Sequence, residues 1–434
     1  MGRATKWLSP REVSLLNRLF VAGVSTLAIL ASAAGANAQG IDPAQVKGKI
    51  VYYTHWTSYL TDGKFDQWEA EFKKLYPNVE DVDVQGITTY SETMSTRLAT
   101  GDYGDALDTP PTVPRDELPD FFVPLDDTGL VPDFYYTSNW AVDDQHYALP
   151  FGVNVEGIVY NKEAFAKAGA EVPKTWTEFL AAAHKLKDAG ITPVVTNLAS
   201  AWPLDVYNGL AVAISGQPDF LDSTVSDPAP FAADKPLGKS LNILHTLITE
   251  GLVEEDLTGD HWEDSKGWMA SGKAAMWFLG NWSINQIITE GSAKSGVPEN
   301  AGNIGYFPLP YDDSGKYNVN SGPDYGMSVS VNSQNQATAK AWVDFLLTKS
   351  DISQIAGFIP GYKKLEPTLP QLAEIQSYGP TIIEQIPPGP AYANTANLIN
   401  YSGGHGIQSV MLADDYNAAI DKLNADWADA ASRQ

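Results

Sequence analysis

The chain has 434 residues and no cysteine, and its 53 acidic and 28 basic residues give a formal net charge of −25 at pH 7. This length is sufficient for two or three domains, and the absence of cysteine excludes disulfide bonds and thiolate metal sites. The negative charge disfavours binding to nucleic acid or to anionic membranes. The apolar fraction of 44% and the 12 tryptophans indicate a packed protein, so we expect a soluble enzyme or a soluble binding protein.

The first 38 residues have the features of a secretory signal peptide. Four basic residues precede an uncharged apolar run at residues 19–34, and Ala36-Asn37-Ala38 supplies the small residues that signal peptidases recognise. We predict cleavage between Ala38 and Gln39. No cysteine follows this point to carry a lipid, so we expect a protein that diffuses freely in the periplasm.

The rest of the chain alternates between strand and helix patterns, as is typical of an α/β protein. A short apolar run at residues 50–53 predicts a buried strand, and a polar and aromatic cluster at residues 55–59 follows it. Thr175 and Glu178 form a capping box that predicts the start of a helix. The remaining patterns predict strands at residues 79–84 and 191–195 and helices at residues 65–75, 91–100, 175–190, 265–270, 281–288, 337–347 and 411–428.

Motifs for catalysis are not found in the sequence. The six histidines are far apart, and there is no nucleophile elbow, phosphate-binding loop or dinucleotide fingerprint. Adjacent acidic residues occur, as at residues 126–127, 254–256 and 414–415, where solvated turns and helix ends explain them in a chain this acidic. We therefore predict no catalytic residues, no metal and no cofactor, although a pair of carboxylates acting across a cleft in a glycoside hydrolase stays possible.

Three tryptophans lie in polar, loop-like surroundings instead of on an apolar helix face. They are Trp56, Trp202 and Trp282. A flat aromatic ring can pack against the C–H face of a sugar, while nearby acids and amides bind its hydroxyl groups. Each of the three rings could equally fill a surface cavity.

Five ordered segments carry a resemblance to a known family. These are LPFGVNVEGIVYNKEAFAKAG at residues 149–169, VPKTWTEF at 172–179, SGKAAMWFLGNWSINQI at 271–287, IGYFPLP at 304–310 and AKAWVDFLLT at 339–348. Together they resemble the extracellular solute-binding proteins of ABC-type sugar importers, the family that includes maltose-binding protein. The resemblance covers nearly all of the chain after the predicted signal peptide.

This resemblance implies a two-lobed α/β periplasmic binding protein fold of type II, with discontinuous lobes joined by hinge crossings. We expect the first lobe at residues 39–152 and 308–347, and the second at residues 153–307 and 348–434. The crossings are expected near residues 152–156, near residues 307–310 and near Thr348. Closure around a ligand would then be a hinge motion.

The resemblance also implies which residues contact the ligand. The expected contacts are Trp56, Asp108, Asn154, Trp202, Trp282, Asp324 and Tyr325, with Tyr362 and His405 as weaker candidates. Thr109-Pro110-Pro111 follows Asp108 where maltose-binding relatives have aromatic and charged contacts, so maltose itself is not assumed.

We therefore expect a periplasmic, monomeric subunit that captures a sugar or small oligosaccharide and delivers it unchanged to a membrane permease. A polyol, peptide or polyamine binder of the same fold is an alternative. A secreted glycoside hydrolase and a rigid carbohydrate-binding module are others. Turnover would identify the hydrolase, and the rigid module would not close around its ligand.

Overall fold

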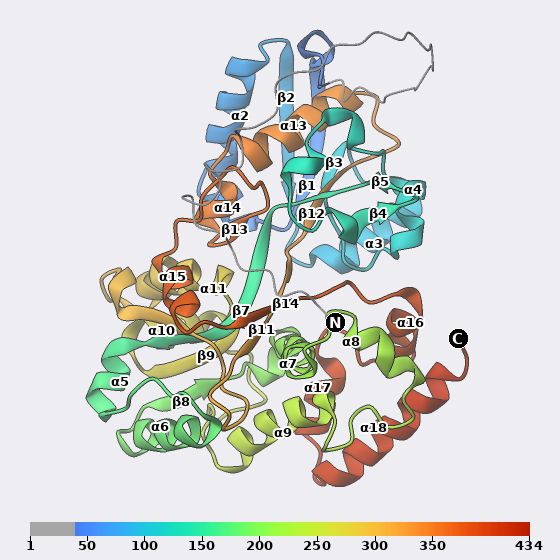
Figure 1. Ribbon diagram of the computed structural model, residues 1–434. Helices are drawn as coiled ribbons and strands as arrows, with labels where there is room; N and C mark the ends of the chain where they lie inside the picture. The colour runs from blue at the N-terminus through green and yellow to red at the C-terminus, as the bar shows by residue number, and fades with distance from the viewer. Residues whose placement is uncertain (1–39) are drawn as a thin grey trace, which may run out of the picture. The chain divides into compact units, whose positions relative to one another are not determined.

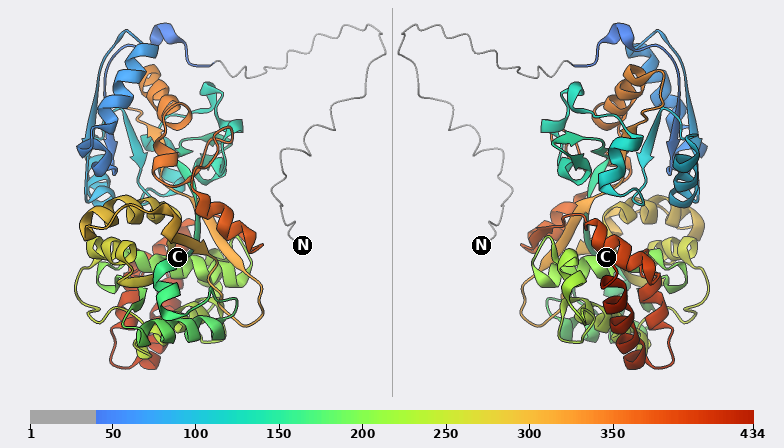
Figure 2. Two further views of the ribbon diagram at one scale, coloured as in Figure 1. Left: turned by 90° about the vertical axis from the view of Figure 1, so that its left-hand side faces the viewer. Right: turned by 90° about the vertical axis from the view of Figure 1, so that its right-hand side faces the viewer.

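The computed structural model describes residues 40–434, which lie in one compact unit, Gln39–Gln434. The predicted signal peptide and its cleavage after Ala38 lie outside the described residues. Two large sheets organise the described part, and we call the elements around them the first lobe and the second lobe. They occupy opposite ends of the ribbon in Figure 1 and in both side views of Figure 2.

The first lobe is built on a five-stranded sheet of order β2-β1-β3-β12-β6. Strands β1, β2 and β3 are parallel, and β12 is antiparallel to β3 and β6. The strands are β1 (Gly48–Thr54), β2 (Val79–Gly86), β3 (Ala106–Thr109), β6 (Leu149–Pro150) and β12 (Gly326–Val329), with a separate hairpin of β4 (Ala141–Val142) and β5 (Gln145–His146). The helices are α1 (Thr57–Thr61), α2 (Lys64–Leu75), α3 (Tyr90–Thr100), α4 (Leu118–Phe121), α13 (Gln336–Thr348) and α14 (Ile352–Ile355).

Aromatic packing between β1, α2 and α13 forms the core of the first lobe. Phe65 and Phe72 lie two turns apart on α2, so both face the sheet. Tyr52 of β1 packs between Phe65 and Trp342 of α13, at ring-centroid distances of 5.9 and 6.2 Å. The helices predicted at residues 65–75, 91–100 and 337–347 and the strand at 50–53 are confirmed.

The second lobe is built on strands β14-β11-β7-β9-β8, with β10 and β13 also paired to β7. The strands are β7 (Gly152–Asn161), β8 (Thr192–Val195), β9 (Ala274–Gly280), β10 (Ile304–Phe307), β11 (Asn318–Pro323), β13 (Ile359–Pro360) and β14 (Thr381–Glu384). The helices are α5 (Lys162–Ala168), α6 (Trp176–Asp188), α7 (Val206–Ser215), α8 (Phe220–Ser223), α9 (Pro236–Thr249), α10 (Trp262–Ser271), α11 (Trp282–Gln286), α12 (Ser292–Ser295), α15 (Pro370–Ser377), α16 (Pro390–Leu398), α17 (His405–Met411) and α18 (Tyr416–Ala431). A π-helical turn, Ile287–Gly291, joins α11 to α12.

Local signals explain where two of these helices begin. Thr175 caps α6, because its side chain accepts a hydrogen bond from the backbone of Glu178 at 3.2 Å. The helix predicted at residues 411–428 is present as α18, but it begins at Tyr416, because Met411 is the last residue of α17. The Asp415 side chain starts α18 by accepting from Ala418 N at 3.0 Å.

Three segments of the chain cross between the lobes and bind one another. Phe151 N donates to Tyr325 O at 3.1 Å, and Asp324 N donates to Gly152 O at 2.9 Å. Gly361 N donates to Phe151 O at 3.2 Å. The crossing expected near residues 152–156 is therefore present. It lies next to two other crossings, near residues 324 and 361, which were expected at other positions.

The second and third crossings lie away from their expected positions. Strand pairing places the second one, and core burial places the third. Residues 318–323, expected in the first lobe, pair as β11 with β7 and β14 of the second sheet, so the chain returns after Pro323 and not at residues 307–310. Ile352 and Phe358, expected in the second lobe, are buried in the first-lobe core, so the last crossing lies beyond Thr348, near residues 357–361.

Candidate functional site

The carboxyl ends of β1 and β3 hold a buried acid and a histidine in contact. These strands are parallel neighbours, so residues that follow one lie beside residues that end the other. The Asp108 side chain is fully buried and accepts from Tyr52 Oη at 2.5 Å, from Thr54 Oγ1 at 2.8 Å and from His55 N at 2.9 Å. Its Oδ2 also lies 2.6 Å from His55 Nδ1. Asp108 is therefore surrounded by protein donors.

Aromatic rings enclose His55 and continue to its neighbour Trp56. The imidazole stacks on Tyr325 with ring centroids 4.2 Å apart and lies 4.4 Å from the Trp56 ring. Trp56 stacks in turn on Tyr59 at 5.1 Å. The result is an aromatic cluster of the first lobe, His55, Trp56, Tyr59 and Tyr325, which ends at the crossing segment containing Tyr325.

Three buried polar atoms at the crossings have no hydrogen-bond partner among the described residues. They are Trp56 Nε1, Asn154 Oδ1 and Asp324 Oδ2. Burial raises the pKa of Asp324 to about 6, although the nearby His55 partly opposes this effect. Unsatisfied buried groups are costly, so an unpartnered donor on the first lobe and unpartnered acceptors on the crossings are suited to a polar ligand.

A cluster of tryptophans lies in the second lobe. Trp202, which is 44% exposed, lies 4.6 Å from Trp262 and 5.9 Å from Trp282 between ring centroids. Trp262 also packs on the buried Trp277 of β9 at 5.2 Å. Trp282 packs against the core of the first lobe as well as that of the second. This ring therefore links the tryptophan cluster to the core of the first lobe.

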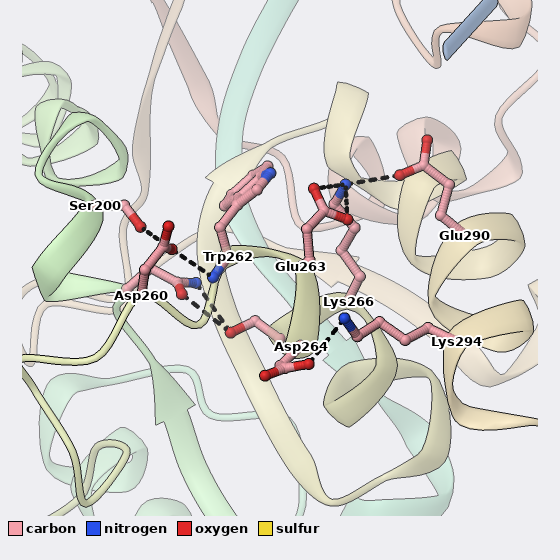
Figure 3. Close-up of polar contacts among 10 residues, drawn as sticks. Ser200, Asp260, Trp262, Glu263, Asp264, Lys266, Glu290 and Lys294 are labelled. Carbon is pink, nitrogen blue, oxygen red and sulfur yellow. Dashed lines mark hydrogen bonds and ion pairs between the residues drawn. The ribbon is translucent and has the colours of Figure 1, made fainter. Parts of the chain in front are cut away.

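Polar contacts around the start of α10 hold Trp262 in place (Figure 3). Asp260 Oδ1 accepts from Ser200 Oγ at 2.9 Å and from Trp262 N at 3.1 Å. The Lys266 ammonium, on the same helix, lies 5.2 Å from the Trp262 ring centroid. It donates to Glu263 at 3.0 Å and to Glu290 at 2.7 Å. The buried lysine is thus fully paired, and it supports the ring instead of facing a ligand.

A second group of acceptors lies next to the crossing on β7 and β11. Glu156 Oε1 accepts from Asn320 Nδ2 at 3.2 Å, while Glu156 Oε2 and Asn320 Oδ1 have no partner among the described residues. Burial raises the pKa of Glu156 to about 8, and the negative charge of Asp205 adds to the effect. The α7 backbone approaches this carboxyl closely at Gly209, where a Cβ atom would lie 2.2 Å from Oε2.

The structure brings most of the predicted contacts into two connected groups. Trp56, Asp324 and Tyr325 surround His55, while Trp202 and Trp282 belong to the tryptophan cluster. Asn154 lies on β7 beside the crossings, where its Oδ1 faces Gly280.

Two kinds of disagreement with the sequence remain. Asp108 is completely buried and contacts His55, so it supports the site without facing a ligand. Tyr362 packs on Phe134 at 5.3 Å, and the exposed His405 begins α17, so neither joins the two groups. Sequence reasoning missed His55, Glu156 and Trp262. Of these, only His55 had a local signal, because it stands next to Trp56 in the cluster after the first strand.

Residues 40–434 contain neither a cluster of metal ligands nor a helix that could span a membrane. No group of three or more histidine, aspartate or glutamate side chains there could hold a metal ion. No helix in the same range is long and apolar enough to cross a membrane.

Comparisons with known proteins agree with this geometry. A model of the family described as bacterial extracellular solute-binding protein matches residues 57–351. Multiple sugar-binding protein of Streptococcus mutans is 26% identical over 218 residues, which cover 49% of this chain and 50% of that protein. An ABC transporter extracellular-binding protein of Pyrococcus horikoshii is 23% identical over 367 residues, 80% of each chain. The chain thus spans about half the length of the first relative.

Solved structures show the same two-lobed fold. BlMnBP1, a binding protein of an ABC transporter from Bifidobacterium animalis subsp. lactis in complex with mannotriose, has 25% identity and a TM-score of 0.77. The match covers 91% of this chain and 97% of that one. RafE of Streptococcus pneumoniae in complex with raffinose has 22% identity and a TM-score of 0.71, over 88% of this chain and 99% of that one.

Proposed function

Because the chain belongs to the family of bacterial extracellular solute-binding proteins, we propose that it is the substrate-binding subunit of an ABC importer. Its ligand is a sugar or small oligosaccharide, held between the lobes and released unchanged to a membrane permease. It acts as a monomer in the periplasm, without a cofactor. The names of similar proteins support this proposal, since they include sugar-binding and periplasmic binding proteins.

One observation carries the proposal. Trp56 Nε1, Asn154 Oδ1 and Asp324 Oδ2 are buried and unpartnered, and they come from the first lobe and from two of the three crossing segments. Buried polar atoms are nearly always paired, so a site that leaves one donor and two acceptors open is built for a partner. A sugar hydroxyl both donates and accepts, and neighbouring hydroxyls can satisfy all three atoms together.

The aromatic rings supply the apolar half of sugar recognition. In the first lobe the partly exposed Tyr59 stacks on the buried Trp56, and Trp202 and Trp282 provide rings from the second lobe. Because Trp202 is 44% exposed, it has surface that a bound ligand can bury. Rings from both lobes favour a ligand that touches both, which couples binding to closure of the hinge.

Backbone hydrogen bonds among the crossing segments suit them to act as this hinge. Asn281, at the start of α11, accepts from Val155 N at 2.6 Å and donates to Gly357 O at 2.6 Å. It therefore connects two crossings and the residue before Trp282. Ligand contact at Trp282 can in this way be transmitted to the relative position of the lobes, which is the signal that a permease would read.

A thermal-shift screen with recovery of the ligand tests the proposal. The panel contains mannotriose, raffinose, monosaccharides, polyols, amino acids and polyamines, and chromatography shows whether each hit is intact. A ligand at a hundredfold excess over its Kd adds about 2.7 kcal/mol of stability. Stabilisation by an intact saccharide supports the proposal. A consumed saccharide would indicate a hydrolase, and stabilisation only by a polyol or amine would reassign the ligand.

A further inference from the structure

We infer that His55 Nε2 is a specificity-determining hydrogen-bond acceptor for the ligand and that Asp108 is the positioning residue that fixes its tautomer. The inference rests on the proposed function and deepens it, because it assigns a role to each of two residues that touch one another. The resemblance implied that Asp108 contacts the ligand. In this inference His55 makes that contact, and Asp108 acts only through His55.

The hydrogen bonds of Asp108 determine which ring nitrogen carries the proton. A carboxylate only accepts hydrogen bonds, so the 2.6 Å contact with His55 Nδ1 requires a proton on Nδ1. In the neutral ring Nε2 then has a free lone pair. No described residue makes a hydrogen bond to Nε2, and the His55 side chain is 20% exposed.

The carboxylate itself cannot turn away from His55. Tyr52 Oη and Thr54 Oγ1 donate to its two oxygens, and its own backbone oxygen accepts from Tyr90 Oη at 2.6 Å. Burial and the adjacent carboxylate raise the pKa of Tyr52, so this phenol stays protonated and remains a donor. Asp108 is therefore held rigidly, as a positioning residue must be.

Rings on several sides fix the imidazole plane. Tyr325 stacks on it with an interplanar angle of 23°, and Tyr90 and Phe151 meet it edge-on at 5.8 and 6.3 Å. The ring centroid of Trp56, the next residue in the chain, lies 4.4 Å from that of His55. The orientation of Nε2 is thus set before a ligand binds, which lowers the entropic cost of recognition.

The neighbours of Nε2 indicate the chemistry of the group that it binds. Trp56 Nε1 is an unpartnered donor and Asp324 Oδ2 an unpartnered acceptor; the Trp56 ring packs beside His55, and Asp324 precedes Tyr325, which stacks on the imidazole. A ligand group that donates to Nε2 and Asp324 and accepts from Trp56 completes the site. Adjacent hydroxyls of a sugar have this pattern, whereas an ether or a methylated hydroxyl cannot donate to Nε2.

The tautomer can be measured without any ligand. Long-range ¹H–¹⁵N NMR spectra of the full chain labelled at histidine should show the proton of neutral His55 on Nδ1. In Asp108→Asn the side-chain amide can donate to Nδ1, so the proton should move to Nε2. A proton on Nε2 in the wild-type protein would overturn the inference, whether or not a saccharide binds.

Binding of mannotriose and raffinose by calorimetry tests the contact itself. For the saccharide that binds, His55→Phe should lower affinity at least tenfold, and His55→Gln should recover part of it because its amide group reaches the place of Nε2. Asp108→Asn should weaken binding similarly, and should add little in a double variant with His55→Phe. His184→Phe, on the surface of α6, is the matched control.

The outcomes separate this inference from the proposed function. Unchanged affinity in His55→Phe overturns the inference and leaves sugar binding intact. If Asp108→Asn does not fold, the wild-type NMR spectrum and the two His55 variants still decide the matter. If neither saccharide nor any other sugar binds the wild-type protein, the proposed function fails, and the role of His55 as a sugar contact fails with it, even where the Nδ1 tautomer is observed.

Discussion

Replacing Glu156 with glutamine should change how stability depends on pH. In the folded protein burial raises the pKa of this carboxyl from 4.5 to about 8, so the folded state keeps its proton where the unfolded state has lost it. Between these two values the free energy of unfolding of the wild-type protein falls as pH rises, by at most about 1.4 kcal/mol per pH unit from this group. The favourable contribution is complete below pH 4.5 and is lost once the pH passes 8.

The size of the effect follows from the same pKa difference. A difference of about 3.5 corresponds to at most about 5 kcal/mol, and partial access of solvent to Glu156 reduces our expectation to about 2–3 kcal/mol. Glu156→Gln is neutral at every pH and keeps an oxygen that can accept from Asn320. It should therefore gain about 2–3 kcal/mol on the wild-type protein between pH 5 and pH 9.

Urea unfolding at pH 5, 7 and 9 measures this difference. Glu384→Gln is the matched control, because Glu384 is exposed at the end of β14 and the substitution removes the same charge. The control should differ from the wild-type protein by a similar amount at each pH. If Glu156→Gln also shows a constant difference from pH 5 to pH 9, the buried and uncharged state of Glu156 is refuted.

Four further substitutions, one of them a control, test ligand binding at Trp202 and folding at the crossings. Trp202→Ala removes an exposed ring, so calorimetry should show at least a tenfold loss of saccharide affinity while the free energy of unfolding changes by less than about 1 kcal/mol; equal affinity would contradict its role as a platform. Gly152→Ala places a Cβ atom 2.3 Å from Phe358 Cβ and should lower the thermal midpoint, whereas Gly322→Ala meets no atom within 4 Å and should leave it nearly unchanged. Asn281→Ala leaves two backbone groups unpaired, so urea unfolding should show a loss of about 2–4 kcal/mol, and a neutral result would contradict its structural role.

Local patterns in the sequence were sufficient to predict individual helices and strands. Phe65 and Phe72 recur at helical spacing, and the helix that they predict is present as α2. Thr175 predicted the start of α6 because an N-cap bond involves residues only three apart. Asp415 acts in the same way, but the apolar positions on both sides of it concealed the break between α17 and α18.

The crossings could not be placed correctly from the sequence because they depend on long-range pairing. β11 joins β7 and β14, which lie more than 160 residues before it and about 60 residues after it. Nothing near residues 318–323 indicates these partners. The crossing expected near residues 307–310 came from the family resemblance alone, which does not contain the pairing of β11 in this chain.

The candidate site was predictable in its residue types but not in its burial. Trp202 and Trp282 stood out because polar residues surround them, whereas Trp262 begins a helix of charged residues and gave no such signal. Asp108 was correctly placed at the end of a strand. Its burial behind His55 depends on Tyr52 and Thr54 of the neighbouring strand, and the sequence does not indicate that contact.

Hydrogen–deuterium exchange with and without a stabilising saccharide tests the central claim most directly. If the ligand binds between the lobes, protection should concentrate in peptides that cover residues 54–59, 152–156, 280–284 and 322–326. These peptides contain the aromatic cluster of the first lobe, two of the crossings and Trp282. Protection in both lobes together with the crossings is the predicted result. Protection confined to one lobe, or absent from all four peptides, would contradict a saccharide site between the lobes.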